Sequence, residues 1–239
     1  MVDRQSVPES KDKLVGDDRG PRDGPFSLGA KKVASVIEPK PFPRRGADRP
    51  VEVLPPQTIQ TARMTLRGLH SGDRDQFVKS LRESDSYLTA GINVRQAGET
   101  PEQCFARLLD ATHAGDMHAK EWRRVGVLAD GRIACMVHLL AIDHALLAKA
   151  DAGWWVFKEF AGHGLATEGV RAMVEHAFAD TPRGLALVQL DAAIAPENEA
   201  SKRVARHAGF VKRDGEATEV LLGDAWRTHE VWRVVVRLG

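Results

Sequence analysis

Apolar and polar residues alternate regularly only after about residue 60. From there, alternation with period two predicts strands, and apolar residues at spacings of three and four predict helices. In chain order, the predicted elements are a strand over 63–67, helices over 73–81 and from 100 onward, strands over 121–129, 132–142 and 153–157, a helix over 165–179, a strand over 185–194, a helix over 199–207, and strands over 218–222 and 229–237. This order predicts an α/β (α+β) domain, in which helices cover both faces of a mixed, mostly antiparallel sheet.

Composition divides the chain at the same place. The first 60 residues hold 9 of the 12 prolines and none of the five tryptophans. Such a segment has too little apolar surface to offset the entropy lost on ordering. We therefore predict a disordered or extended arm over 1–58 and one folded domain over 59–239, in whose core most of the tryptophans lie.

Several classes of protein are disfavoured by charge and composition. The formal net charge is +1, which is not the strongly basic field that nucleic-acid binding requires. The longest apolar run, 133–142, is too short for a membrane span, and the N-terminus lacks the apolar stretch of a secretory signal. Cys104 and Cys135 have neither disulfide-framework nor metal-ligand spacing. We expect a cytoplasmic protein without a metal, nucleic-acid partner or membrane partner.

The most informative segment is a glycine loop, Gly162-His163-Gly164, between a predicted strand and the longest predicted helix. Glycines there let a ligand approach the backbone, and the free amides at the helix start favour an anion such as phosphate. The simpler alternative is a tight turn that needs glycine only for its dihedral angles. The P-loop lysine is missing, and Thr167 replaces the third glycine of a dinucleotide fold, so both of those phosphate-binding loops are excluded.

Four segments together resemble one family. They are 61–67 (TARMTLR), 159–164 (EFAGHG), 195–201 (APENEAS) and Gly209-Phe210. Their types and order are similar to those of the GNAT superfamily of acetyl-CoA-dependent N-acetyltransferases, in particular the Rim-type branch that acetylates ribosomal-protein N-termini. The resemblance covers about residues 59–238.

The resemblance implies a site for acetyl-CoA, with no metal. By position, it implies pyrophosphate contacts from Gly162, His163, Gly164, Leu165, Ala166 and Thr167, and pantetheine contacts from Trp155, Val156, Phe157 and Asn198. Ser201 is the implied proton donor to the thiolate, or a contact of the thioester. From the residues alone, Asn198 is also a good helix cap, and the two roles are compatible.

Attack by a neutral amine on a thioester needs a base or a chain of waters. Asp191 is the predicted base, because a charge in so apolar a strand needs an explanation. The alternative is a structural carboxylate paired with a buried donor such as a Trp indole. His138 is a weaker candidate base, since a histidine in such a strand is more often a core residue.

Four positions depart from the family pattern, namely Glu159, Ala205, Cys135, which replaces a glycine, and Thr228, which stands where Rim-type members often have Asp. Glu159 stands where many members carry Gln or Arg, and Ala205 stands where other branches have a tyrosine acid. The predicted function is transfer of acetyl from acetyl-CoA to a primary amine, either a protein N-terminus or a small molecule, by a monomer or homodimer. The alternative is a non-catalytic adaptor with the same fold that binds coenzyme A or a protein.

Overall fold

The computed structural model describes residues 58–89, 92, 94–223 and 225–236. The predicted arm therefore lies outside the described residues, apart from residue 58. The elements are β1 (Ile59–Gln60), β2 (Met64–Arg67), α1 (Arg74–Thr89), α2 (Pro101–His118), β3 (Trp122–Leu128), β4 (Ile133–Asp143), β5 (Lys149–Val156), α3 (Leu165–Phe178), β6 (Gln189–Ile194), α4 (Glu199–His207), β7 (Val211–Leu222) and β8 (Ala225–Val235). Short 3-10 helices cover Ser71–Asp73 and Lys158–Phe160.

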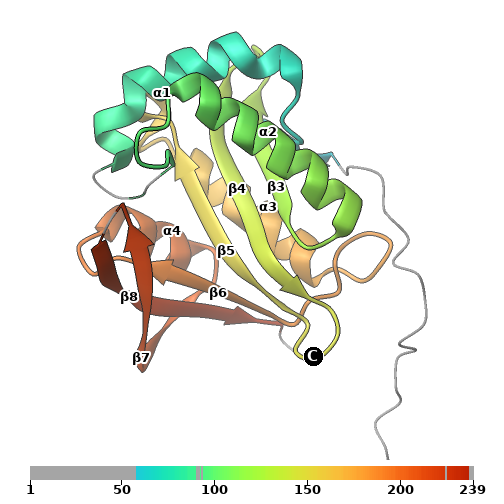
Figure 1. Ribbon diagram of the computed structural model, residues 1–239. Coiled ribbons are helices and arrows are strands. Elements are labelled where there is room, and N and C mark those ends of the chain that lie inside the picture. Colours follow the sequence, from blue (N-terminus) through green and yellow to red (C-terminus); the bar gives the residue numbers. More distant parts are fainter. Residues whose placement is uncertain (1–57, 90–91, 93, 224, 237–239) are drawn as a thin grey trace, which may run out of the picture. The chain divides into compact units, whose positions relative to one another are not determined.

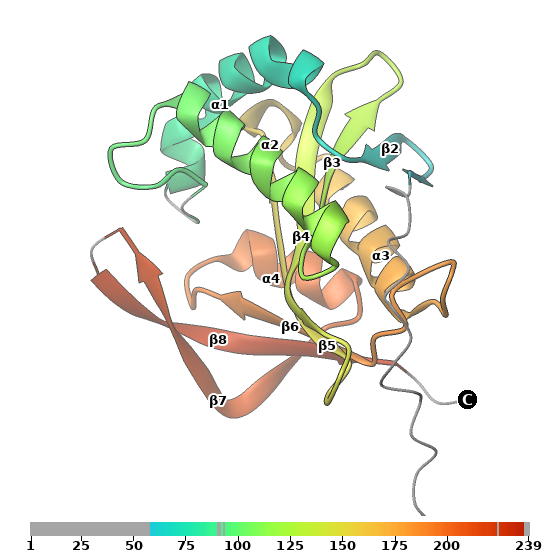
Figure 2. The same cartoon turned by 45° about the vertical axis from the view of Figure 1, so that its right-hand side comes forward.

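The strands form one sheet in the order β1-β2-β3-β4-β5-β6-β8-β7. Neighbouring strands are antiparallel except β5 and β6, which are parallel. Figure 1 and Figure 2 show α1 and α2 on one side of the sheet and α3 on the other. Each helix layer covers its own apolar core, one around Phe77, Phe105 and Trp155 and the other around Trp154, Met173 and Leu190. The predicted fold class is confirmed.

Local signals place the helix starts correctly. Thr100 caps α2, its side chain accepting from the amide of Gln103, and Pro101 occupies the first position. Asn198 caps α4 in the same way, accepting from the amide of Ser201. Both caps satisfy amides that the helix itself leaves unpaired.

Strand limits differ more from the prediction. β5 begins at Lys149, before the predicted start, because pairing with β4 extends it through residues that are not apolar. β6 begins only at Gln189, since the chain before it takes a positive φ at Ala186. β7 begins at Val211 and crosses an irregularity in its pairing at Gly215, whose φ is also positive.

Candidate active site

The glycine loop leads directly into α3. Gly162 and Gly164 have φ values of 80° and 76°, a region that favours glycine. Gly164 is the N-cap of α3, and no side chain caps that helix, whose first amides are open to a ligand. Residues 162–164 are exposed. The tight-turn interpretation is thus correct, and it is compatible with an anion at the helix start.

A carboxylate in the first turn of α3 is fully occupied by the N-terminal strand region. Glu168 accepts hydrogen bonds from the Thr61 hydroxyl (2.6 Å), the Arg63 amide (2.7 Å) and the Arg63 Nε (2.6 Å). Arg63 Nη1 also donates to the His163 carbonyl at 2.9 Å. These bonds lower the pKa of the Glu168 carboxyl against the effect of its burial. They neutralise Glu168 and connect residues 61–63 to the glycine loop.

The acidic departure at Glu159 is matched by a cation. Arg132 forms an ion pair with Glu159, and both side chains are about half exposed. The guanidinium of Arg132 also lies over the ring of Phe160, 5.1 Å from its centroid. The charge of Glu159 is therefore compensated beside the loop.

β5 and β6 separate in the middle of the sheet. Their pairing covers only three positions and ends with Asp151 opposite Asp191. Beyond this pair β5 continues toward α1 while β6 turns away alongside β8 (Figure 1). The separation opens a gap next to Trp155 and Val156. The amide of Phe157 is already bonded to the Ala134 carbonyl, and its side chain is buried.

A cavity of about 610 Å³, here called the coenzyme cavity, extends from the glycine loop to this gap. It brings together most of the predicted coenzyme residues and Ser201: Trp155, Val156, Gly162, Gly164, Leu165, Ala166, Thr167, Asn198 and Ser201. Phe157 and His163 do not line it. A second cavity of about 910 Å³, the acceptor cavity, shares Trp155, Asn198 and Ser201 with the first. The two cavities meet where β5 and β6 separate.

Asp191 lines the acceptor cavity, and its carboxylate is paired. Arg233 donates to its two oxygens at 2.6 and 3.0 Å, and Gln189 donates at 2.9 Å. The paired-carboxylate alternative is therefore the arrangement that forms, with an arginine as donor in place of an indole.

Asp151, which the sequence analysis did not single out, lies beside Asp191 in the same cavity. None of the hydrogen bonds or ion pairs among the described residues involves its carboxylate. Desolvation of its carboxylate, and then the negative charge of Asp191, raise the pKa of Asp151, although the residue itself is exposed. Its alternation with Gly153 and Trp155 on one face of β5 is the signal that could have drawn attention to it.

His138 is not a core residue. It is half-buried, lines the acceptor cavity, and lies opposite Gly153 in the pairing of β4 with β5. A Cβ on Gly153 would lie 2.7 Å from the His138 Cε1 and closer still to Nε2, so the glycine makes room for the ring. Burial and the charge of Arg123 lower the pKa of His138 to about 4, which leaves it neutral at pH 7.

The expectation for the tryptophans has a direct outcome. Trp154, Trp155 and Trp232 are buried as predicted, but Trp226 is 67% exposed, because it lies near the end of the β7–β8 hairpin. No group of metal-binding side chains occurs among the residues the structure describes. Within the same residues, none of the helices combines the length and apolar character needed to cross a bilayer.

The site of this α/β protein thus combines a glycine loop at a helix start, a gap between two parallel strands and two adjoining cavities. Comparison with known proteins identifies the family. Residues 63–211 match the model of the acetyltransferase (GNAT) domain, so the chain belongs to the GNAT acetyltransferase family and is an acetyl-CoA-dependent acyltransferase.

Individual relatives agree with this assignment. The chain is 29% identical over 169 residues to the probable N-acetyltransferase YjcK of Bacillus subtilis (strain 168), covering 70% of this chain and 85% of that protein. It is similar in structure to Mycobacterium smegmatis RimJ in complex with CoA-disulfide, with a TM-score of 0.66, 21% identity and coverage of 75% and 88%. It also resembles the microcin C7 self-immunity acetyltransferase MccE in complex with acetyl-CoA and AMP, with a TM-score of 0.64, 15% identity and coverage of 77% and 99%. At these identities the structural matches establish the fold.

Proposed function

We propose that the chain transfers an acetyl group from acetyl-CoA to a primary amine by direct attack of the amine on the thioester. The observation that carries the proposal is the meeting of the two cavities at the gap between β5 and β6. An extended ligand bound along the coenzyme cavity would present its reactive end to the acceptor cavity at that point.

The residues of the coenzyme cavity fit coenzyme A. Open amides at the start of α3 would donate hydrogen bonds to the pyrophosphate, with Gly162 and Gly164 leaving the approach unobstructed and Thr167 adding a hydroxyl. Trp155 and Val156 lie along the gap where the pantetheine arm would run. The Asn198 side chain accepts from the Ser201 amide, which leaves its NH₂ group available to the arm.

Two carboxylates at the end of the gap compete for the role of base. Asp191, the base predicted from sequence, has both oxygens engaged by Arg233. Asp151 has no such partner, and its raised pKa brings it closer to the value that proton transfer near neutral pH requires. The contacts favour Asp151 as the group that accepts the amine proton, with Asp191 and Arg233 holding the adjacent charge in place.

Ser201 is our candidate donor to the departing thiolate. It lines both cavities, and its amide donates to the Asn198 side chain at 3.0 Å, which fixes the first turn of α4. A thiolate is a fair leaving group, so we expect Ser201→Ala to lower kcat only about tenfold, below the usual range for general acids.

The first test is binding and turnover. A ligand that binds only the folded state raises its melting temperature. We expect coenzyme A to do so, and thiol to be released from acetyl-CoA in the presence of a suitable amine. Deleting residues 1–57 should leave the affinity for coenzyme A unchanged, because we place the arm outside the catalytic domain. No thermal shift at millimolar acetyl-CoA would contradict the proposal.

The second test separates the two carboxylates. Asp151→Asn should lower kcat at least about 100-fold and remove the acidic limb of the pH profile, with little change in coenzyme affinity. Asp191→Asn leaves Arg233 with Glu216 as its remaining ion-pair partner and should weaken acceptor binding more than it lowers kcat. The reverse assignment, with Asp191→Asn abolishing the pH dependence, would make Asp191 the base.

The adaptor alternative loses one of its grounds. It depended partly on the negative charge of Glu159 beside the expected pyrophosphate. Arg132 compensates that charge, so we do not carry the adaptor forward as a second function.

A further inference from the structure

Charged side chains of opposite sign occupy opposite walls of the acceptor cavity. One wall carries Arg107 from α2 and Arg123 from β3. The other carries Asp151, Asp191 and Glu216. Arg233 pairs with Asp191 at 2.6 Å and with Glu216 at 3.2 Å, and it forms no ion pair with Asp151. The cavity is therefore polarised across the sheet.

Arg123 is a buried cation with unused hydrogen-bonding capacity. Its side chain is only 14% exposed, and one terminal nitrogen pairs with Glu121 at 2.7 Å. Its Nε is buried and has no partner among the described residues. A buried N–H donor without a hydrogen-bond partner destabilises the folded state, and a ligand or water that accepts a hydrogen bond from it would remove that cost.

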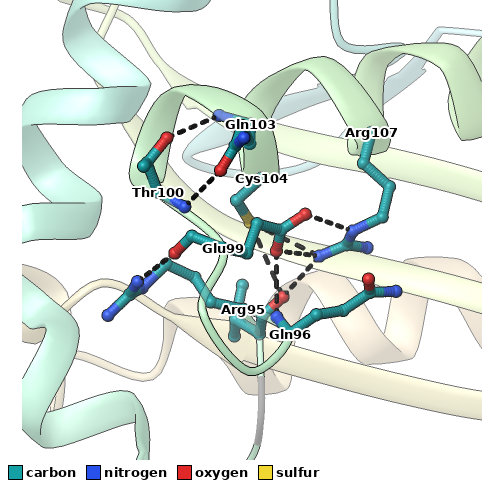
Figure 3. A network of polar contacts seen from close by, with 8 residues as sticks. Arg95, Gln96, Glu99, Thr100, Gln103, Cys104 and Arg107 are labelled. Atoms are coloured by element: carbon teal, nitrogen blue, oxygen red, sulfur yellow. Dashed lines mark hydrogen bonds and ion pairs between the residues drawn. The ribbon is translucent and has the colours of Figure 1, made fainter.

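Arg107 is held rigidly at the same wall. Its Nε and Nη2 donate to the two oxygens of Glu99 at 2.7 and 2.8 Å, and Nη2 also donates to the Val94 carbonyl at 2.9 Å. Figure 3 shows this network around Glu99 and Cys104. None of the hydrogen bonds among the described residues uses Arg107 Nη1. A guanidinium fixed in this way loses little entropy on binding an anion.

We infer that the acceptor carries, besides its primary amine, an anionic group several bonds away, and that Arg123 and Arg107 bind this group. The inference rests on the proposed function, because it places the amine at Asp151. β3, which carries Arg123, and β5, which carries Asp151, are two strand spacings apart, about 10 Å between backbones. An α-amino carboxylate, with its two charges adjacent, is too short to reach both walls. An acidic peptide N-terminus or an ω-amino acid has the required chemistry.

The same geometry assigns neutral His138 a place between the two walls. It lies opposite Arg123 in the pairing of β3 with β4, and opposite Gly153 on the other side. An amine bound near Asp151 would thus meet no positive charge from the His138 ring. An anion bound at Arg123 could still accept a hydrogen bond from the N–H of the same ring.

The test is acetyl transfer to matched acceptors, measured as thiol released from acetyl-CoA by the full chain. One pair consists of C-terminally amidated tetrapeptides, Ala-Glu-Ala-Ala and Ala-Gln-Ala-Ala. The other consists of 5-aminopentanoate and its amide. Each pair differs only in the anionic group, and the two pairs distinguish a peptide source from a small-molecule source.

We expect kcat/KM to be at least about tenfold higher for the charged member of one pair, as hydrogen bonds between charged groups provide. Arg123→Gln and Arg107→Gln should each reduce this ratio toward one, and Arg123→Lys should retain part of it. Arg82→Gln, which removes an exposed arginine that pairs with Glu102 and does not line the cavity, should leave the ratio unchanged. Coenzyme A affinity, measured separately, should be the same in all variants.

Equal or reversed kcat/KM within both pairs would overturn the inference alone, since thiol release would still support acetyl transfer. A preference that survives both Arg123→Gln and Arg107→Gln would also overturn it. If Arg123→Gln does not fold, the wild-type ratio and Arg107→Gln decide the question. Coenzyme A binding with no thiol release from any acceptor would overturn the proposed function, and the inference with it.

Discussion

The contact between Gly153 and His138 allows a sharp test of the acceptor cavity. Replacing Gly153 by alanine would place a Cβ 2.7 Å from the His138 Cε1 and closer still to Nε2, well inside van der Waals contact. The φ of Gly153 is not positive, so the backbone itself accepts alanine. The imidazole must therefore move, and overpacking of this kind costs about 1–3 kcal/mol.

A double-mutant cycle isolates this clash. Gly153→Ala alone should lower the free energy of unfolding by about 1–3 kcal/mol. In the background of His138→Ala the ring is gone, and the same change should be nearly neutral, since alanine also restricts the unfolded chain. The measurement is denaturant unfolding of the four proteins. Gly68→Ala is a suitable control, because its added Cβ would meet nothing closer than 3.5 Å.

The same cycle has a kinetic outcome. Gly153 lines the acceptor cavity and not the coenzyme cavity. Gly153→Ala should therefore raise the KM for the amine while leaving the affinity for coenzyme A unchanged. An equal cost of Gly153→Ala with and without the His138 ring would refute the reasoning, because it would mean that the clash does not determine the energy.

Three further predictions concern the rest of the domain. Ala119, the C-cap of α2, has a φ of 52°, so Ala119→Gly should stabilise the protein by up to about 1 kcal/mol in denaturant unfolding. Burial lowers the pKa of His176 to about 4, whereas an unfolded histidine titrates near 6.5. Protons therefore bind the unfolded state more tightly, and the free energy of unfolding should fall by about 2 kcal/mol between pH 7 and pH 5. His176→Gln should remove that part of the pH dependence of stability. Arg63→Ala removes the cation that pairs with Glu168 in the first turn of α3, and the uncompensated carboxylate repels an anion. Calorimetry should find coenzyme A bound about tenfold more weakly, and Arg63→Ala combined with Glu168→Gln should recover part of the loss.

Features that depend on neighbours in the chain were predictable from the sequence. The glycine loop, the start of α3 and the caps at Thr100 and Asn198 are encoded within a few residues, because dihedral preferences and unpaired amides act over one helical turn. The order of strands and helices followed from periodicity for the same reason. The family signature belongs to this group, since its motifs are short segments.

Strand ends and side-chain partners were not predictable in this way. β5 extends to Lys149 because β4 and β6 pair with it, although those residues lack a strand pattern of their own. Asp191 stands out in the sequence as a charge in an apolar strand, but its partner Arg233 lies 42 positions further along the chain. Asp151 gains its significance only because the parallel pairing places it opposite Asp191.

The sequence by itself thus determined the fold class, the loop that leads into α3 and the residues that cap α4, because each depends on local backbone chemistry. The tertiary structure decided where β5 and β6 separate, which carboxylate is left without a partner, and how charge is distributed over the acceptor cavity. Those properties arise from contacts between segments as far apart as Arg63 and Glu168, which are separated by 105 positions. No local pattern encodes such pairings, since they depend on how the whole sheet is assembled.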